Sequence, residues 1–392
     1  MSLPLGKKFI PNRDFVVNND NKPRWNNIAY RRYAFHHLDE VSRYCQSFRA
    51  SAVLPLIPAQ DQALAAHPKL RKMVEHPWFS AMVVVQEDRI LFEEYAEDFA
   101  PTRLHSIQSI TKTMIHLMIG VLLEAGKIKL DATVETYLPE VNTGYRGFTL
   151  QHVLNMDVPN DYIGNFDDPN DKYWGYEEAM GWRLNSVSPH EPTIREYIAK
   201  IENNTGKKSD GIVKYKDPNT DILAWIIERQ SGRPLAHHLA DIVDAAGIEG
   251  RMAMATDRDG IPIMDGGACM TPRDAARYGL IFPRLNHGEK ILSTSNGGQW
   301  GAARPIGSRA FMRESLTPGT VWTAGDSKYW YKNQTEGDGH SIAHAGYCGQ
   351  YLYANLDTGK VAVYFSVSQT LSGTCDQHHV DIYDMLQQVT KN

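Results

Sequence analysis

Ser109 and Lys112 are the residues whose types and spacing most directly suggest chemistry. They stand three positions apart at the start of an apolar run that stops at Gly126, and a helix there would place both side chains on one face. A serine hydroxyl becomes a nucleophile when a base takes its proton, and a buried lysine with a lowered pKa can be that base. The N–H groups at a helix N-terminus favour a developing negative charge. The pair therefore predicts acyl transfer, with Ser109 as nucleophile and Lys112 as its proton partner.

The same spacing also fits a helix-capping serine and a surface lysine. An amine inside an apolar helix would be costly to bury without a role, which favours the catalytic interpretation.

Two later segments could complete such a site. Tyr215 lies in a polar segment before a predicted helix, and a tyrosinate can exchange a proton with a nearby lysine. In residues 344–350, Gly346 and Gly349 would let a strand backbone approach a substrate and offer an N–H near Cys348 to an oxyanion. Taken alone, the first segment also fits an ordinary surface tyrosine, and the second fits a glycine-rich hairpin turn.

Hydrophobic periodicity indicates the elements that must position these residues. Strands are predicted at residues 81–86, 90–95, 350–356 and 360–366, and helices at residues 109–126, 151–156, 194–202, 221–230, 272–282 and 382–389. Strands towards both ends of the chain enclose a helical block, which predicts an α/β (α+β) fold with an inserted, mostly helical domain. We expect an N-terminal arm at residues 1–40, with little structure of its own up to about residue 30. We also expect a core domain at residues 41–145 and 255–392, and a helical domain at residues 146–254.

The composition limits the classes of function and location. The 392 residues carry a formal net charge of −5, which gives no reason to expect a nucleic acid partner. The apolar runs are too short to span a bilayer, and the N-terminus lacks the apolar stretch of a signal peptide. We therefore expect no membrane partner and a cytoplasmic location, with a periplasmic location left open. Four widely spaced cysteines indicate free thiols.

No metal or organic cofactor is expected. Cys375, His378 and His379 are potential metal ligands, but adjacent histidines do not form a known chelating spacing, and a solvated loop or helix start fits better. Neither a Gly-x-Ser-x-Gly nor a His-Glu-x-x-His motif occurs, which argues against the common α/β-hydrolase and zinc peptidase classes. The expected partner is a small-molecule substrate, and a homodimer is left open.

The order of the three motifs carries a family resemblance. Ser-x-x-Lys at 109–112, Tyr-x-Asp at 215–217 and His-x-Gly at 344–346 resemble the Ser-x-x-Lys, Tyr-x-Asn and Lys-Thr-Gly series of the serine β-lactamase and penicillin-binding-protein superfamily. That superfamily includes class C β-lactamases, D-alanyl-D-alanine peptidases and family VIII carboxylesterases. The segments 126–131, 148–156 and 266–277 also look similar to its connecting segments. The resemblance runs from about residue 75 to the C-terminus and implies an antiparallel sheet flanked by helices.

Within this superfamily the chain resembles the 6-aminohexanoate-dimer hydrolases, which act on nylon oligomers, most clearly at residues 31–38 and 219–229. The resemblance implies that Phe166 occupies the place of a tyrosine near the substrate amide, and Glu177 that of an aspartate facing the substrate amine. It places His344, Gly346, Cys348 and Gly349 on the oxyanion and substrate strand. The predicted pocket consists of Phe166, Glu177, Trp182, Asp217, Asp265 and Trp330.

Two departures shape the functional prediction. His344 replaces the lysine of Lys-Thr-Gly, and a largely neutral imidazole holds a substrate carboxylate less well, which argues against a strong β-lactamase. Asp217 stands where Asn or Ser is usual. An ester has a better leaving group than an amide and needs less help from protonation. The sequence predicts a serine hydrolase that acts through an acyl-enzyme on small esters and on amides of short ω-amino acid oligomers. The alternatives are a β-lactamase or D-alanyl-D-alanine peptidase, and a non-catalytic penicillin-binding-type sensor.

Overall fold

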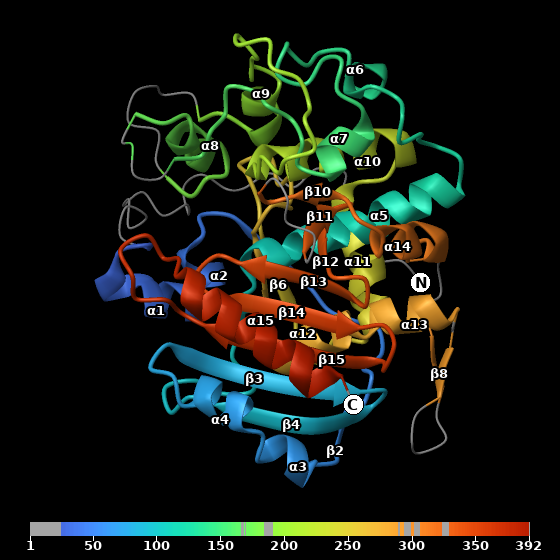
Figure 1. Cartoon of the computed structure of the whole chain (residues 1–392). Helices are drawn as coiled ribbons and strands as arrows, with labels where there is room; N and C mark the ends of the chain where they lie inside the picture. Colours follow the sequence, from blue (N-terminus) through green and yellow to red (C-terminus); the bar gives the residue numbers. More distant parts are fainter. Residues whose placement is uncertain are drawn as a thin grey trace.

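A nine-stranded sheet forms the centre of the fold in the computed structural model, which describes residues 25–165, 168, 170–183, 191–288, 291–293, 299–301, 306–323 and 329–391 (Figure 1). In spatial order its strands are β10 (Thr320–Val321), β11 (Trp330–Lys332), β12 (Thr335–Gly337), β13 (Ser341–Gly346), β14 (Gln350–Asn355), β15 (Lys360–Ser366), β3 (Phe79–Gln86), β4 (Arg89–Tyr95) and β2 (Ile57–Pro58). Neighbouring strands are antiparallel except β2 and β4.

Helices cover both faces of this sheet, which explains why β3 is apolar along nearly its whole length. Met82 and Val84 join the core beneath helices α4 (Pro68–Val74) and α15 (Asp376–Thr390), whereas Val83 and Val85 belong to the core on the opposite face. Helix α12 (Pro272–Gly279) packs on that opposite face against β14, β15 and β3. A strand buried on both faces loses the polar alternation of a half-exposed strand.

A second sheet leads directly to the predicted nucleophile. It contains β1 (Cys45–Phe48), β6 (Met252–Ala255), β7 (Ala268–Met270) and β5 (His105–Ser106) in that order. The chain passes from β5 into the 3-10 helix η3 (Gln108–Lys112) and then into the buried helix α5 (Thr113–Glu124). The single helix predicted from residue 109 is therefore two elements, and Ser109 lies in the tighter first turn.

Helices dominate the part of the molecule at the top of Figure 1. They are α6 (Val134–Tyr137), α7 (Leu150–Leu154), α8 (Tyr173–Ala179), α9 (Ile194–Ile198) and α10 (Asp217–Ser231). Helix α11 (Leu235–Ala246) lies lower and packs against α12. The remaining elements are α2 (Leu38–Val41), α3 (Gln62–Ala65), α13 (Ile281–His287), α14 (Arg309–Ser315), β8 (Ile291–Ser293) and β9 (Gln299–Gly301). The predicted α/β class with antiparallel sheets flanked by helices is confirmed, and the domain boundaries stay a prediction. Within the described residues, no helix is long and apolar enough to cross a membrane.

The N-terminal arm predicted at residues 1–40 includes a helix. Helix α1 (Ile28–His36) follows Asn27, whose side chain accepts a hydrogen bond from the backbone of Ala29 and caps the helix. Arg31 is only 1% exposed, and its guanidinium donates to the carbonyl oxygens of Ser368 at 2.9 Å and Thr370 at 2.6 Å. These contacts hold α1 against the loop after β15, and α1 begins at Ile28, close to where the segment with little structure was expected to end.

Candidate active site

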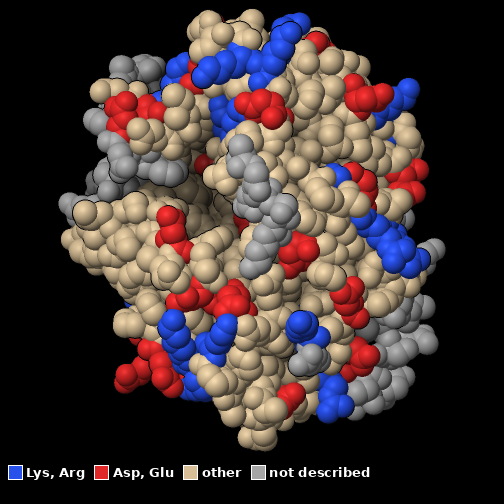
Figure 2. Space-filling model, in the orientation of Figure 1, with Lys and Arg blue, Asp and Glu red and all other residues tan. Residues whose placement is uncertain are grey.

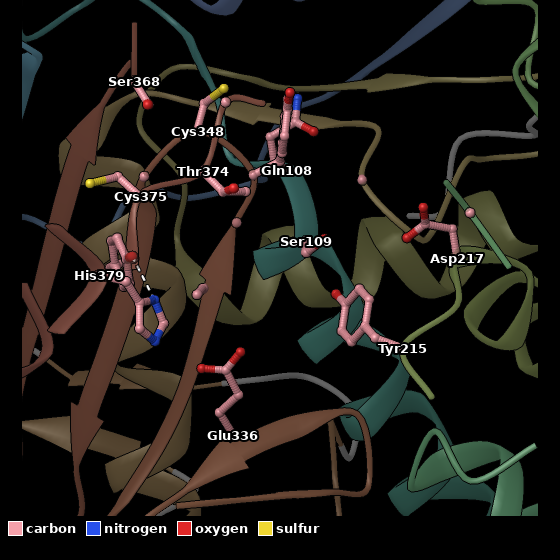
Figure 3. A pocket seen from close by; sticks show the side chains of 18 of the residues that line it. Gln108, Ser109, Tyr215, Asp217, Glu336, Cys348, Ser368, Thr374, Cys375 and His379 are labelled. Carbon is pink, nitrogen blue, oxygen red and sulfur yellow. Dashed lines mark hydrogen bonds between the residues drawn. The ribbon is translucent and has the colours of Figure 1, made fainter. Parts of the chain in front are cut away.

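Ser109 is presented by a strained turn. Gln108, the residue before it, has a left-handed backbone with φ of 48°, and its side chain donates to the Ser106 hydroxyl at 2.7 Å. A non-glycine residue in this conformation costs about 1–3 kcal/mol and persists only where its surroundings enforce it. Here β5 fixes the incoming chain and the apolar α5 fixes the outgoing chain. The turn leaves the Ser109 side chain facing a cavity (Figure 3).

Lys112 is fully buried beneath Ser109, and its ammonium group has three acceptors. Nζ donates to Ser109 Oγ at 3.1 Å, to Asp217 Oδ1 at 2.9 Å and to the carbonyl oxygen of Asp265 at 2.6 Å. Burial, the largest single effect, lowers the pKa of Lys112, but the nearby carboxylates of Asp217 and Asp265 together raise the pKa above its ordinary value. This environment favours the ammonium form of Lys112 over the amine with a lowered pKa that the sequence suggests.

Tyr215 places a phenol beside the Ser109 and Lys112 pair. Its hydroxyl is buried and makes no hydrogen bond of normal geometry to a described residue, and its ring lies 4.9 Å from Lys112 Nζ. Burial and the Asp217 carboxylate raise the pKa of Tyr215 well above 10, whereas the nearby Ser109 hydroxyl lowers it by less. The resting side chain is thus a neutral phenol.

A buried lysine holds the Tyr215 segment in place. The ammonium of Lys216 donates to the carbonyl and side-chain oxygens of Asn160 at 2.7 and 2.8 Å. Burial lowers the pKa of Lys216 to about 8. Helix α10 then begins at Asp217, with Pro218 in its first turn, where proline is well tolerated. The segment is consequently fixed on both sides of Tyr215 and Asp217.

The end of β13 lies directly against the nucleophile turn. A Cβ atom on Gly346 would stand 2.7 Å from the Ile107 carbonyl oxygen and 3.0 Å from Gln108 Cβ, so only glycine allows this approach. In the turn that follows, Cys348 has φ of 65°, and Gly349 donates from its backbone to the Gly346 carbonyl at 3.2 Å. Among the described residues, the backbone N–H groups of Ser109 and Cys348 have no hydrogen-bond acceptor. Two donors of this kind beside a nucleophile are suited to an oxyanion.

His344 lies on β13 behind the cavity wall. The ring is fully buried, donates from Nδ1 to the Ala345 carbonyl at 2.7 Å, and brings Nε2 within 3.3 Å of the Tyr331 hydroxyl. Burial lowers the pKa of His344, so the imidazole is neutral. His344, which the resemblance places where the lysine of Lys-Thr-Gly would stand, therefore presents no charge to a ligand.

The cavity in front of Ser109 has a volume of about 770 Å³. Figure 2 shows a hollow on this face, between the helical part above and the sheet below. Of the residues predicted for the site, those that line the cavity are Ser109, Tyr215, Asp217, Asp265, Trp182, Gly346, Cys348 and Gly349. Lys112 lies directly behind Ser109. The structure therefore brings together residues that are far apart in the sequence.

Three other predicted pocket residues have different outcomes. Glu177 is buried behind the wall, where it accepts from the Tyr173 hydroxyl at 3.0 Å and pairs with Arg183 at 3.2 Å. Trp330 does not line the cavity, because its indole N–H donates to the Ser315 carbonyl at 3.1 Å on the other side of β11, so its predicted pocket role is wrong. Phe166 lies outside the described residues.

Sequence reasoning missed several aromatic and acidic residues of the cavity. They are Trp25 from the arm, Trp322, Tyr329, Glu336 from β12, Tyr351 from β14, and His379 and Tyr383 from α15. The i, i+4 spacing of His379 and Tyr383 at the start of a helix was the available signal, since it places both on one helix face. Cys375, His378 and His379 lie at the start of a helix, one of the two positions expected for them: Cys375 precedes α15, and the two histidines lie in its first turn.

Comparison with known proteins agrees with this geometry. Residues 70–378 match the beta-lactamase family. The chain is 27% identical over 349 residues to the 6-aminohexanoate-dimer hydrolase of Paenarthrobacter ureafaciens, covering 87% of this chain and 86% of that protein. A Bacillus anthracis structure named as a 6-aminohexanoate-dimer hydrolase superimposes with a TM-score of 0.79 at 22% identity, covering 97% and 98% of the two chains. The hydrolase EstCE1, with promiscuous acyltransferase activity, gives a TM-score of 0.60 at 13% identity, covering 83% and 98%. The chain is a hydrolase of the beta-lactamase family.

Proposed function

We propose that this hydrolase cleaves small esters, and amides of short ω-amino acid oligomers, through an acyl-enzyme on Ser109. The observation that carries the proposal is the position of Ser109 Oγ at the cavity wall, 3.1 Å from the buried Lys112 ammonium and beside the buried Tyr215 hydroxyl. The similarity to a 6-aminohexanoate-dimer hydrolase supports the amide substrates, and the resemblance to EstCE1 supports only the shared fold.

In the acylation step, Tyr215 acts as the base in those molecules whose phenol has first released its proton to the solvent. The positive charge of Lys112, 4.9 Å from the ring, stabilises the phenolate, which accepts the proton of Ser109 as Oγ attacks the substrate carbonyl. The backbone N–H groups of Ser109 and of the turn at Cys348 stabilise the oxyanion, and one such donor typically contributes about 10²–10³ in rate. Tyr215 then returns the proton to the leaving alcohol or amine.

Deacylation uses the same groups in reverse order. Tyr215 takes a proton from a water molecule, the resulting hydroxide attacks the acyl carbonyl, and Ser109 recovers its proton as the carboxylic acid leaves. The overall reaction consumes one water for each ester or amide bond. Lys112 keeps its proton throughout, because its three hydrogen bonds to Ser109, Asp217 and Asp265 depend on the ammonium form. It is a positioning and electrostatic residue in this mechanism.

A β-lactamase or D-alanyl-D-alanine peptidase activity is less well supported by the site. Substrates of both classes carry a carboxylate, which enzymes usually hold with a cationic side chain. His344 is neutral and buried, and no Lys or Arg lines the cavity within the described parts of the chain. The three-residue arrangement of Ser109, Lys112 and Tyr215 likewise counts against a non-catalytic sensor.

The test is labelling with a fluorophosphonate probe, read as intact mass, together with hydrolysis of p-nitrophenyl acetate and butyrate. Wild type should take one adduct and turn over both esters, and Ser109→Ala should lose both properties. Ser368→Ala is the matched control, because Ser368 is another serine on the cavity wall and its loss should leave labelling intact. Labelling or turnover that persists in Ser109→Ala would overturn the mechanism. A wild type that neither reacts nor turns over ester would favour the sensor.

A further inference from the structure

Helix α1 carries a buried arginine whose hydrogen-bond acceptors are all neutral oxygens. Arg31 is only 1% exposed. Its guanidinium donates through Nη1 to the carbonyl oxygens of Ser368 at 2.9 Å and Thr370 at 2.6 Å, and through Nη2 to that of Leu371 at 3.2 Å. No Asp or Glu among the described residues forms an ion pair with it. A buried cation without an anionic partner is costly, so its position at this loop indicates a role beyond anchoring a helix.

The loop that Arg31 holds is bonded in turn to the backbone beside the nucleophile. The N–H of Ser368 donates to the carbonyl oxygen of Cys348 at 3.0 Å. The Gly349 carbonyl accepts two hydrogen bonds from Ser366, at 3.0 Å from its backbone and at 2.9 Å from its hydroxyl. Figure 3 shows Cys348 and Ser368 together at the edge of the cavity. A single residue, Ser368, therefore links the Arg31 guanidinium to the turn that carries Cys348.

A second contact from the arm reaches the same turn from its other side. Asn26 donates from Nδ2 to the hydroxyl of Tyr347 at 2.9 Å, and this hydroxyl donates to the Ser372 carbonyl at 2.8 Å. Arg31 holds Asn26 as well, because its Nε donates to the carbonyl and side-chain oxygens of Asn26 at 3.1 and 2.9 Å. Tyr347 directly precedes Cys348 in the chain. We call Asn26 and Arg31 the arm clamp, since together they join the arm to both sides of the Cys348 turn.

Helix α1 has a separate anchor that does not reach this turn. Arg32 pairs with Asp98 at 2.6 Å and donates to the carbonyl oxygens of Trp78 at 3.2 Å and Phe79 at 2.9 Å, at the start of β3. Two adjacent arginines thus hold the same helix to different parts of the molecule. If the arm served only to cover the sheet, the loss of either arginine would have similar consequences for activity, which makes the pair a direct comparison.

We propose that the arm clamp positions the oxyanion donor at Cys348, with Arg31 and Asn26 as positioning residues for the reaction. The inference rests on the proposed acyl transfer at Ser109. Cys348 has a left-handed backbone with φ of 65°, which persists only where its surroundings enforce it. An oxyanion donor is effective only within a narrow range of distance and angle. Acylation and deacylation both pass through an oxyanion, so loss of the clamp should lower kcat and leave KM nearly unchanged.

The test compares p-nitrophenyl butyrate with its thiono analogue, in which C=S replaces C=O. Sulfur is a weak hydrogen-bond acceptor, so hydrolysis of the thionoester depends less on the oxyanion donors than hydrolysis of the ester does. Arg31→Met keeps most of the side-chain volume and removes the guanidinium. It should reduce kcat for the ester about 10- to 100-fold with KM within about threefold, and should lower the ratio of ester to thionoester kcat/KM at least about fivefold. A general loosening of the fold would leave this ratio unchanged.

Arg32→Met is the matched control, because it removes the other anchor of α1 and should leave the ratio within about twofold of wild type. Asn26→Ala is the second variant, and it tests the clamp even if Arg31→Met does not fold, since it removes only the contact to Tyr347 and the acceptors for Arg31 Nε. It should lower the ratio about threefold. A ratio unchanged in every folded clamp variant, or lowered equally by Arg32→Met, would overturn the proposal.

Amide hydrogen exchange separates this inference from the proposed function, because it needs no substrate. The backbone N–H groups of Gly349, Ser366 and Ser368 are hydrogen-bonded within the turn and the loop that the clamp holds. Their exchange should become at least about tenfold faster in Arg31→Met and stay unchanged in Arg32→Met. If wild type turns over neither substrate, the proposed hydrolysis fails, and exchange still decides whether the clamp holds the turn. Unchanged exchange in a folded Arg31→Met protein would refute the clamp, whatever the activity of wild type.

Discussion

Replacing Asp217 with asparagine is expected to destabilise the protein and alter the pH dependence of its activity. Asp217 Oδ1 lies 2.9 Å from Nζ of the fully buried Lys112. Two unit charges at this separation attract by about 6 kcal/mol at an effective dielectric constant of 20. Asparagine keeps a weaker acceptor and has a smaller desolvation cost, whereas breaking a buried pair typically costs about 3–5 kcal/mol. We expect Asp217→Asn to lower the free energy of unfolding by about 3 kcal/mol.

The assay for this loss is thermal unfolding by calorimetry. For a chain of 392 residues, an unfolding entropy of about 2.1 cal/mol/K per residue converts 3 kcal/mol into a decrease in Tm of roughly 4 °C. The pKa of Lys112 is higher in the folded protein than its ordinary value of 10.5. The ion pair with Asp217 therefore stabilises the fold fully below pH 10.5, and this stabilisation is lost as the pH rises beyond the pKa of Lys112 in the folded protein. The difference between wild type and variant should therefore be constant from pH 7 to 9 and shrink above pH 10.5.

The matched control is Asp210→Asn, which removes the exposed carboxylate paired with Lys214. A surface pair contributes about 0–1 kcal/mol, so Tm should change by roughly 1 °C at most. Because ionised Tyr215 is the proposed base, kcat/KM should rise with pH as this phenol loses its proton. The Asp217 carboxylate raises the pKa of Tyr215, so Asp217→Asn should shift this rise to lower pH. Equal Tm values for the two variants, together with an unchanged pH profile, would refute the assigned charge state of the site.

Two further predictions concern how the backbone is held. Gly346→Ala should reduce kcat about 100-fold with little change in circular dichroism, because the new methyl would displace the β13 end from the Ile107 carbonyl; activity within threefold of wild type would contradict the close approach. In wild type, burial lowers the pKa of the Lys216 amine to about 8, so between about pH 8 and 10.5 the unfolded protein binds more protons than the folded protein. Lys216→Met removes this amine. Urea unfolding of wild type should accordingly show a stability gain over that range that Lys216→Met lacks, and parallel pH curves for the two proteins would contradict it.

The fold was predictable where local pattern and tertiary environment agree. Residues 81–86 and 360–366 are apolar enough to read as buried strands, and the structure contains β3 and β15 there. The strand β13 was missed because Ser341–Gly346 contains a histidine and a glycine and has little strand propensity of its own. It is a strand because β12 and β14 pair with both of its edges.

The candidate site likewise contains features that a local sequence pattern reveals and features that depend on distant parts of the chain. The Ser109 and Lys112 pair is visible because the two residues are three positions apart. The charge of Lys112 depends on Asp217, 105 positions later, which no local pattern reveals. Pocket residues on strands are harder to predict: Trp330 was expected in the cavity and does not line it, whereas Glu336 lines it and was not expected. The face of the sheet that a side chain occupies depends on the strand register, and a shift of one residue moves it to the other face. His379 and Tyr383 reach the cavity wall through the packing of α15, and each looks like an ordinary helix residue in the sequence.

The distribution of the cavity wall along the chain has a consequence for biosynthesis. The wall joins Trp25 and Ser109 to Glu336 and Tyr383, which are made much later. At about 5–20 residues per second, Ser109 leaves the ribosome roughly 15–50 s before Tyr383 is synthesised. A nascent chain therefore carries the proposed nucleophile for that time without the segments from β12 to α15 that complete the cavity around it. Hydrolytic activity should appear only after α15 has been translated and has docked, so the first turnover marks the end of folding.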